Sequence, residues 1–286
     1  MGPVLEAPEG SVDDDDCARG DGLLLEARDV TIGFGGVLAL DEVSMSIDSG
    51  EVVGVIGPNG AGKTTLFNVI CGFVHPSSGR ITYRDRDLHR HRPHDLAKLG
   101  IARTLQGVGL CAGLTVLENV MLGAQPVLRS DPVSSFLGLR RSSREERQTA
   151  TRAMEVLGDL GVAVHADRLP SALPYAVQKQ TALARALMAE PRLLLLDEPA
   201  SGLSEAEMAA LGSRIRSLTA SMSVLLVEHH MDLVMSVCDR IVVLNFGRVI
   251  AHGTPDAIRA DPEVATAYLG DEVEAMSAPT DGGNDA

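Results

Sequence analysis

The stretch Gly57-Pro58-Asn59-Gly60-Ala61-Gly62-Lys63-Thr64 fits the pattern G-x-x-x-x-G-K-[ST] of a phosphate-binding loop. Directly before it, residues 51–56 (EVVGVI) are apolar and rich in β-branched side chains, which predicts a buried strand. After it, residues 62–71 predict a helix with its apolar side chains on the inner side. Backbone N–H groups of such a loop point at phosphate oxygens, and the helix start adds partial positive charge. We therefore expect a nucleotide to bind at this loop.

Individual side chains of the loop have separate expected tasks. Lys63 is expected to reach the β- and γ-phosphates, and the Thr64 hydroxyl to face Mg²⁺. A pattern of eight residues also arises by chance, so the strand before it and the helix after it carry much of the prediction. The residues expected to contact the nucleotide here are Gly57, Pro58, Asn59, Gly60, Ala61, Gly62, Lys63, Thr64 and Thr65.

The length and charge of the chain limit the number of domains and locate its acidic ends. Its 286 residues, 45% of them hydrophobic, suit one α/β domain with a substantial insertion, or two small domains that share a core. The formal net charge of −14 belongs mainly to the ends, because residues 1–22 hold seven acids against one arginine and residues 271–286 hold five acids and no base. Both ends are rich in Gly, Pro, Ser and Asp, which predicts disordered acidic tails. The run Asp13 to Asp16 could hold a cation, but a solvated tail is the favoured interpretation.

Cysteine spacing and hydropathy indicate the compartment. The four cysteines (Cys17, Cys71, Cys111 and Cys238) are scattered and include no CxxC pair, which favours reduced thiols in a cytosolic protein. The N-terminus lacks a basic stretch followed by an apolar one, so no secretory signal is predicted. No window approaches 18 consecutive apolar residues, so no membrane-spanning helix is predicted.

The remaining chain predicts an α/β fold with a helical insertion. Thr115 with Glu118, and Ser204 with Glu207, form capping-box patterns that predict two helix starts. Residues 108–190 are predicted to be mostly helical, between strands of the core. Beyond the segments already named, strands are predicted at 23–34, 43–47, 80–83, 100–106, 192–198 and 224–227, and a closing pair of strands over 240–250. Helices are predicted at 115–122, 142–160, 175–189, 204–219 and after 254.

Two predicted strands end in chemically active side chains. Four leucines lead to Asp197 and Glu198, and a later apolar run leads to His229. Because parallel strands deliver their ligands at their carboxyl ends, these residues should lie beside the phosphate loop. Asp197 is then suited to hold Mg²⁺ and Glu198 to polarise an attacking water. The competing interpretations are a surface acid for Glu198 and a structural histidine for His229.

A second group of histidines offers a weaker metal prediction. His89, His91 and His94 lie in a basic segment, but no acid or cysteine accompanies them at ligand spacing. A solvated loop is the favoured interpretation there.

These features together resemble the ATP-binding subunits of ABC transporters over about residues 23–270. The resemblance implies a P-loop NTPase core with a mostly parallel sheet, an N-terminal antiparallel β subdomain, an inserted helical subdomain, and ATP and Mg²⁺ as cofactors. It implies that Phe34 stacks on adenine and that Gln106 contacts both Mg²⁺ and the attacking water. Asp197 and Glu198 match the Walker B acids, the segment Ser201 to Ser204 the D-loop, and His229 the histidine that contacts the γ-phosphate.

Four further stretches resemble the branched-chain amino acid importer group within that family, although relatives that move urea or amides share them. These stretches are residues 100–104 (GIART), 113–120 (GLTVLENV), 228–235 (EHHMDLVM) and 267–270 (AYLG). The resemblance implies transmembrane permease subunits and a second ABC ATPase as partners, an extracytoplasmic solute-binding protein as an indirect one, and no nucleic acid. It also implies a peripheral location at the cytoplasmic face of the plasma membrane.

The chain departs from the family at its signature, L-S-[GY]-G-[QE], which here reads Leu173-Pro174-Tyr175-Ala176-Val177. Pro174 removes a serine hydroxyl and a backbone N–H, and Ala176 adds a Cβ where close approach to phosphate is expected. Pro174 still suits a helix start, so the fold should survive.

In this family each ATP site joins one subunit's P-loop to the other's signature. We therefore predict an asymmetric heterodimer with a normal-signature ATPase, with a homodimer as a slower alternative. A regulatory subunit with little hydrolysis is the other alternative.

Overall fold

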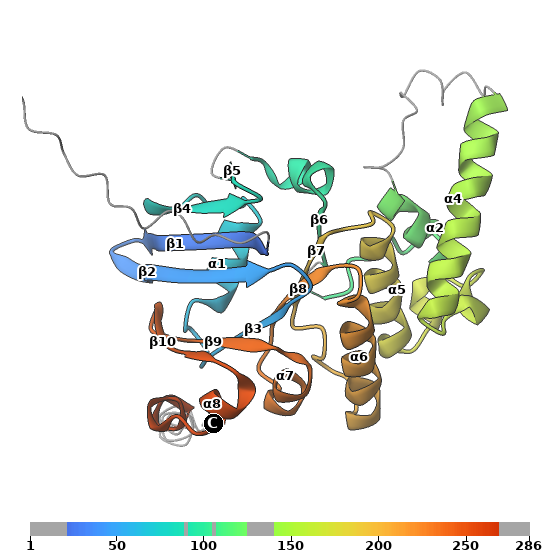
Figure 1. Ribbon diagram of the computed structural model, residues 1–286. Coiled ribbons are helices and arrows are strands. Elements are labelled where there is room, and N and C mark those ends of the chain that lie inside the picture. Colours follow the sequence, from blue (N-terminus) through green and yellow to red (C-terminus); the bar gives the residue numbers. More distant parts are fainter. Residues whose placement is uncertain (1–21, 89–90, 105–106, 125–139, 269–286) are drawn as a thin grey trace, which may run out of the picture.

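The computed structural model describes residues 22–88, 91–104, 107–124 and 140–268, which fold into two sheets flanked by helices (Figure 1). The smaller sheet is antiparallel, with strand order β2-β1-β4-β5. Its strands are β1 (Leu23–Phe34), β2 (Val37–Asp48), β4 (Ser78–Tyr83) and β5 (Arg86–Asp87). The predicted N-terminal strand is confirmed. β2 is longer than the predicted 43–47, because the turn at Gly35 and Gly36 lets it pair with β1 along nearly its whole length.

The larger sheet is mostly parallel, as predicted, with strand order β10-β9-β3-β8-β7-β6. Only its β9–β10 edge is antiparallel. Its strands are β3 (Val52–Ile56), β6 (Ile101–Arg103), β7 (Leu193–Asp197), β8 (Ser223–Val227), β9 (Arg240–Asn245) and β10 (Arg248–Gly253). β6 is shorter than the predicted 100–106, since the chain leaves the sheet after Arg103.

Each central strand is buried on both faces, because its residues alternate between two hydrophobic cores. Leu194 and Leu196 of β7 pack in one core with the helices of the insertion, whereas Leu193 and Leu195 pack in the other with the small sheet. Burying one leucine side chain stabilises a fold by about 1.5–3 kcal/mol. The run of four leucines therefore fixes β7, and with it Asp197, firmly between two layers.

Helices cover the two faces of this sheet (Figure 1). α1 (Lys63–Ile70) packs on the face that meets the small sheet. α5 (Tyr175–Leu187), α6 (Glu205–Leu218) and α7 (Met231–Val237) pack on the other face. The remaining helical segments are η1 (Pro93–Leu99), α2 (Val116–Met121), η2 (Leu122–Ala124), α4 (Arg140–Asp159), η3 (Ala163–His165), η4 (Pro170–Ala172) and α8 (Pro255–Arg259).

The predicted helix starts agree closely with the structure. Thr115 and Ser204 are the N-caps of α2 and α6, and both capping boxes are formed. The basic segment that holds His89, His91 and His94 (residues 84–94) was predicted as a solvated loop. It instead contains β5 and the first two residues of η1, and His89 lies outside the described residues. Within the described ranges, none of the helices combines the length and apolar composition that a membrane crossing requires.

The cysteines within the described ranges are free thiols. Cys71 and Cys238 are buried and Cys111 is exposed. Burial raises the pKa of both Cys71 and Cys238 to about 12, so neither thiol ionises readily near neutral pH. Cys17 and nearly all of the predicted acidic tails lie outside the described residues.

Candidate nucleotide-binding site

The glycine positions of the phosphate loop are required by its backbone. Gly57, Gly60 and Gly62 all have φ between 78° and 150°, a region that other residues rarely adopt. A Cβ on Gly57 would collide with the carbonyl oxygen of Leu244, and one on Gly62 would lie 2.6 Å from the carbonyl oxygen of Ala39. The loop is therefore held tightly between β9 and β2, and glycine alone allows that close backbone path.

Lys63, the first residue of α1, closes the loop on itself. Its ammonium donates hydrogen bonds to the carbonyl oxygens of Gly57 (2.6 Å) and Pro58 (2.7 Å) and is 8% exposed. Thr64 is exposed and Thr65 half-buried, so both follow the lysine at the open end of α1. A confined cation, the backbone N–H groups of a helix start and a glycine-lined backbone fit a bound phosphate chain.

Asp197 ends β7 as a nearly buried carboxylate, 9% exposed. Burial is the main cause that raises its pKa, and the negative charges of Glu198 and Glu228 add to it. The positive charges of Arg103 and Lys63 act in the opposite direction. A nearby cation stabilises the negative charge of a carboxylate that lies close to two others. Carboxylate and hydroxyl oxygens are ligands that Mg²⁺ prefers. Asp197 and the Thr64 hydroxyl therefore fit a magnesium site.

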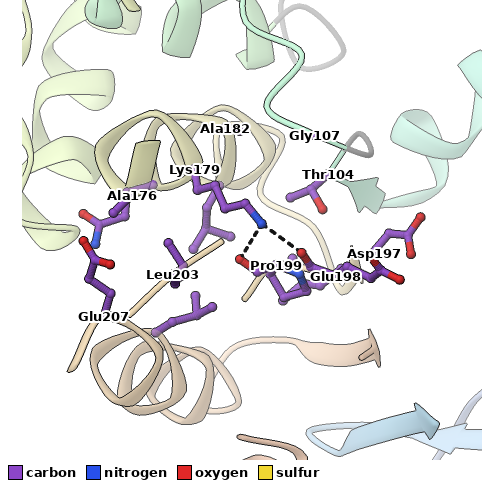
Figure 2. A pocket seen from close by; sticks show the side chains of 14 residues that line it. Thr104, Gly107, Ala176, Lys179, Ala182, Asp197, Glu198, Pro199, Leu203 and Glu207 are labelled. Carbon is purple, nitrogen blue, oxygen red and sulfur yellow. Dashed lines mark hydrogen bonds between the residues drawn. The ribbon is translucent and has the colours of Figure 1, made fainter. Parts of the chain in front are cut away.

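Glu198 occupies an unusual backbone conformation directly after the strand. Its φ of 46° lies in the left-handed region, which costs a non-glycine residue roughly 1–3 kcal/mol. Its N–H donates to the Val227 carbonyl (2.9 Å), which ties the end of β7 to the end of β8. The Lys179 ammonium from α5 donates to the carbonyl oxygens of Glu198 (2.9 Å) and Pro199 (3.0 Å), as Figure 2 shows. The surroundings thus hold the strained turn in place.

A small cavity of about 40 Å³ lies behind this turn, between α5 and α6. Lys179 enters it from α5, and Thr104 and Gly107 line it from the chain that leaves β6 (Figure 2). Gln106 itself lies outside the described residues, so its predicted contacts stay a prediction. Its neighbour Thr104 is fixed, because the Thr104 N–H donates to the Leu195 carbonyl at 3.0 Å.

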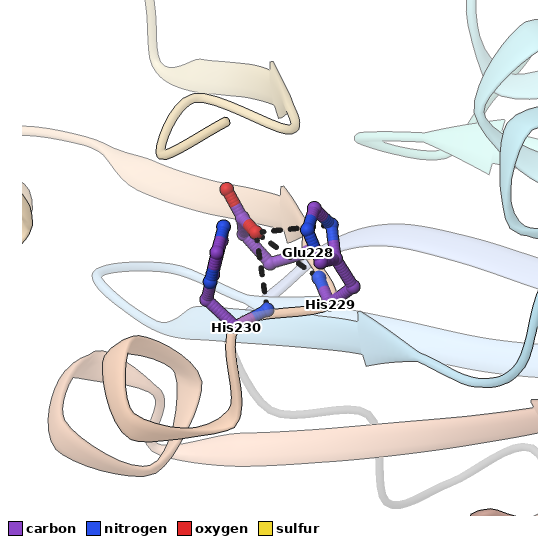
Figure 3. A group of neighbouring side chains, drawn as sticks. All are labelled: Glu228, His229 and His230. Atoms are coloured by element: carbon purple, nitrogen blue, oxygen red, sulfur yellow. Dashed lines mark hydrogen bonds and ion pairs between the residues drawn. The ribbon is translucent and has the colours of Figure 1, made fainter. Parts of the chain in front are cut away.

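His229 follows β8 and is positioned by a fully buried acid. Glu228 accepts the N–H groups of His229 (3.0 Å) and His230 (3.3 Å) with one carboxylate oxygen. Its other oxygen accepts the Ala200 N–H (2.7 Å), so Glu228 joins the loop after β8 to the loop after β7. The His229 side chain is half exposed, with Nδ1 3.7 Å from Glu228 (Figure 3).

The strand order explains why these groups converge. β3, β8 and β7 are parallel neighbours, so the phosphate loop, His229 and Asp197-Glu198 all leave the same edge of the sheet. Phe34 lies at the end of β1 with 52% of its surface exposed. The same hairpin reaches the phosphate loop through Ala39 of β2. Phe34 is thus accessible to a ligand, and its stacking on adenine stays a prediction.

Comparison with known proteins gives the family. The model described as ABC transporter matches residues 40–201, and the model described as Branched-chain amino acid ATP-binding cassette transporter matches residues 248–274. The chain is 40% identical over 250 residues to LivG of Salmonella typhimurium, a high-affinity branched-chain amino acid transport ATP-binding protein. That match covers 87% of this chain and 98% of LivG. The chain belongs to the ABC transporter ATP-binding family.

Solved cassettes share the fold of this ABC ATPase. An ABC transporter cassette in its ADP conformation aligns with a TM-score of 0.75 and 31% identity, over 87% of this chain and 99% of that one. A cassette solved as a dimer with ADP and phosphate aligns with a TM-score of 0.70 and 25% identity, over 81% and 99%. The predicted fold class is therefore confirmed, and membership of the family makes the chain an ATPase.

The signature segment of this ABC ATPase forms the start of α5. Pro174 is the N-cap rather than the first helical residue, and it supplies no side-chain hydrogen bond to the helix. The Gln178 side chain instead donates back to the Leu173 carbonyl at 3.0 Å. The Tyr175 ring lies against Gly202 of the D-loop, where a Cβ would sit 3.0 Å from it. The helix therefore starts normally, but without the hydroxyl that the family places there.

Sequence reasoning missed three residues of this site. Lys179 holds the Glu198 turn, and Glu228 joins two loops. The Arg103 guanidinium lies 4.0 Å from the centre of the Phe73 ring, and its charge offsets part of the rise in the pKa of Asp197. Glu228 had a usable signal, because an acid directly after a buried strand needs buried partners. The partners of Lys179 and Arg103 come from distant segments and have no local signal.

Proposed function

We propose that the chain is the ATP-hydrolysing subunit of an importer for branched-chain amino acids or similar small polar solutes, such as urea or amides. The solute class is supported by the likeness to LivG and by the match of residues 248–274 to the branched-chain amino acid cassette model. In this proposal the chain works at the cytoplasmic face of the membrane and drives transmembrane permease subunits. An extracytoplasmic solute-binding protein delivers the solute to those permease subunits.

One observation carries the site assignment: three parallel neighbouring strands end in the phosphate loop, in Asp197-Glu198 and in His229. Lys63 neutralises phosphate charge once its ammonium leaves the carbonyls of Gly57 and Pro58. Glu198 orients and polarises the attacking water, and His229 contacts the γ-phosphate. Gln106 contacts both the metal and that water, and Phe34 stacks on the base. Thr64, Gln106 and Asp197 would hold Mg²⁺, which would supply positive charge beside the phosphates.

The second ATPase subunit is proposed to be a related chain with a normal signature. Each shared site needs a P-loop from one subunit and a signature from the other. Losing one preorganised donor to transition-state charge lowers a rate by roughly 10²–10³. The site built on this chain's P-loop is then the active one, and the site built on Leu173-Pro174-Tyr175-Ala176-Val177 mainly binds ATP. A purely regulatory subunit is not favoured, because Glu198 would have no task in it.

The test is steady-state ATP hydrolysis by the purified chain across protein concentration, with Glu198→Gln as the control. We expect the chain alone to bind ATP and hydrolyse it slowly, and hydrolysis to rise when a normal-signature partner is added. Activity of the chain alone that rises more steeply than linearly with concentration, and is lost in Glu198→Gln, would contradict the asymmetric pairing. A chain that does not bind ATP would contradict the site assignment itself.

A further inference from the structure

Glu228, His229 and His230 form a cluster that the ATPase site does not fully use. Among the described residues they are a group whose potential metal-ligand atoms all lie within 4.8 Å of one another. Figure 3 shows the two imidazole rings on either side of the Glu228 carboxylate. The ring centroids are 4.2 Å apart. Glu228 is buried, His230 half-buried and His229 exposed, so the cluster opens to solvent on one side.

The Glu228 carboxylate, which hydrogen bonds hold in place, can still accept a metal ion. An ionised carboxylate offers about four acceptor positions. The N–H groups of Ala200, His229 and His230 use three of them, so one position is left. The same hydrogen bonds hold the carboxylate and the backbone of both histidines in one arrangement. Such outer-shell bonds to a ligating carboxylate orient it and support affinity.

The two histidines can complete the set. In a tetrahedral zinc site with bonds of about 2.0–2.1 Å, the ligand atoms lie roughly 3.4 Å apart. Because His229 is exposed and the His230 side chain makes no capping bond to α7, rotations of the two rings can close the remaining separation. Two imidazoles and one carboxylate suit Zn²⁺ and Cu²⁺, whereas Mg²⁺ takes oxygen ligands. Water would fill the fourth position.

We propose that Glu228, His229 and His230 bind a zinc-class transition-metal ion, and that this ion inhibits ATP hydrolysis by engaging His229. The first half of the proposal, that a metal ion binds (the binding half), depends on the cluster alone. The inhibitory half rests on the proposed function, in which a ring nitrogen of His229 contacts the γ-phosphate. Coordination through Nδ1, the nitrogen that lies 3.7 Å from Glu228, leaves Nε2 as a hydrogen-bond donor but holds the ring turned toward Glu228 rather than toward the nucleotide.

The binding half is tested by calorimetric titration of zinc chloride into the full chain, stripped of metal and without nucleotide. His230→Asn keeps a polar residue that is favoured at an N-cap but removes an imidazole ligand. We expect it to weaken one zinc site by at least about tenfold, the scale on which altered metal sites lose affinity. His252→Asn, at an exposed position on β10, is the matched control and should bind zinc like the unaltered chain.

This comparison also separates other zinc ligands. The exposed Cys111 thiol is the same in all three proteins, so any zinc that it binds does not affect the difference between the variants, which reports the cluster. Equal zinc affinity in His230→Asn and in the unaltered chain would overturn the proposal. Thermal unfolding of each variant without zinc checks that the folds match, and His230→Gln provides a second substitution if His230→Asn unfolds.

The inhibitory half is tested by ATP hydrolysis in zinc-buffered solution with excess Mg²⁺, each protein being compared with its own zinc-free rate. Zinc at the affinity measured by calorimetry should reduce hydrolysis by the unaltered active complex several-fold and leave the relative rate of the His230→Asn complex unchanged. Zinc that binds at the cluster without slowing hydrolysis would overturn this half. A complex that never hydrolyses ATP would count against the proposed function, while the calorimetric result would still decide the zinc site.

Discussion

Glu198 combines a strained backbone with the position expected of the catalytic carboxylate. We predict that Glu198→Gln lowers ATP hydrolysis by the active complex about 10²–10⁴-fold, the usual contribution of a positioned general base. ATP binding should be retained, because the amide has nearly the same shape. Single-turnover hydrolysis measures the loss of rate, and nucleotide-binding measurements check that ATP binding is retained. Glu205→Gln, at an exposed position on α6, is the matched control, and a normal rate in Glu198→Gln would assign the base to another group.

Asp197 should make the stability of the nucleotide-free protein depend on pH. Its folded-state pKa is raised, chiefly by burial, so the folded protein holds this proton more tightly than the unfolded chain. Stability from this group is therefore gained as pH falls through the raised pKa and lost above it. Asp197→Asn removes the buried charge, and we predict a higher melting temperature than the unaltered chain near neutral pH.

The pH trend and the ligand response provide the controls for Asp197→Asn. The difference in melting temperature should narrow as the pH falls below the raised pKa, because both side chains are then neutral. The gain in melting temperature caused by Mg²⁺ with ATP should be smaller in the variant, because it lacks the proposed metal ligand. A melting temperature below that of the unaltered chain at every pH would show that Asp197 stabilises the empty fold.

At the scale of elements, Lys179 links the signature helix α5 to the turn after β7. Its two hydrogen bonds to backbone carbonyls hold Glu198 and Pro199, and burial lowers its pKa. We predict that Lys179→Met, which keeps the apolar stem, destabilises the fold by about 1–2 kcal/mol. It should also reduce kcat with little change in the KM for ATP, because Glu198 loses support while the phosphate loop is untouched.

Urea unfolding and steady-state kinetics measure these two effects. Lys179→Arg should restore much of both properties, since a guanidinium can also donate to two carbonyls. Lys98→Met, on the exposed surface of η1, is the control for removing a positive charge. A normal kcat in Lys179→Met would show that the turn after β7 keeps its conformation without α5.

The elements also show where prediction from the sequence succeeds and where it ends. The starts of α2 and α6 were predictable to the residue, because a capping box is a local interaction of side chains three positions apart. The convergence of Asp197, Glu198 and His229 followed from buried strands alone. The extra length of β2 and the contacts of Lys179 were not predictable, because each depends on pairing with distant segments rather than on local pattern.

At the scale of the whole molecule, the signature helix is positioned by contacts within the chain. In the proposed asymmetric dimer it lacks the groups that the second subunit's ATP requires. Tyr175, Gln178 and Lys179 hold the start of α5 against the rest of the chain. The defect is therefore chemical rather than structural: a missing hydroxyl at Pro174 and an added Cβ at Ala176. A chemical defect on an intact helix should be repairable by substitution.

We predict that the triple variant Pro174→Ser, Ala176→Gly and Val177→Gln raises ATP hydrolysis by the chain on its own by roughly 10²–10³-fold, the value of one restored oxyanion-type donor. The serine introduced by Pro174→Ser would also cap α5, which stabilises a helix by about 1 kcal/mol. The measurement is the rate per chain across protein concentration, with light scattering to follow ATP-dependent dimers.

Adding Glu198→Gln to the triple variant should abolish the gain, since hydrolysis in such a dimer depends on this chain's own carboxylate. A triple variant that dimerises with ATP yet stays as slow as the unaltered chain would show that the signature does not limit hydrolysis. The asymmetric heterodimer would then lose its physical basis.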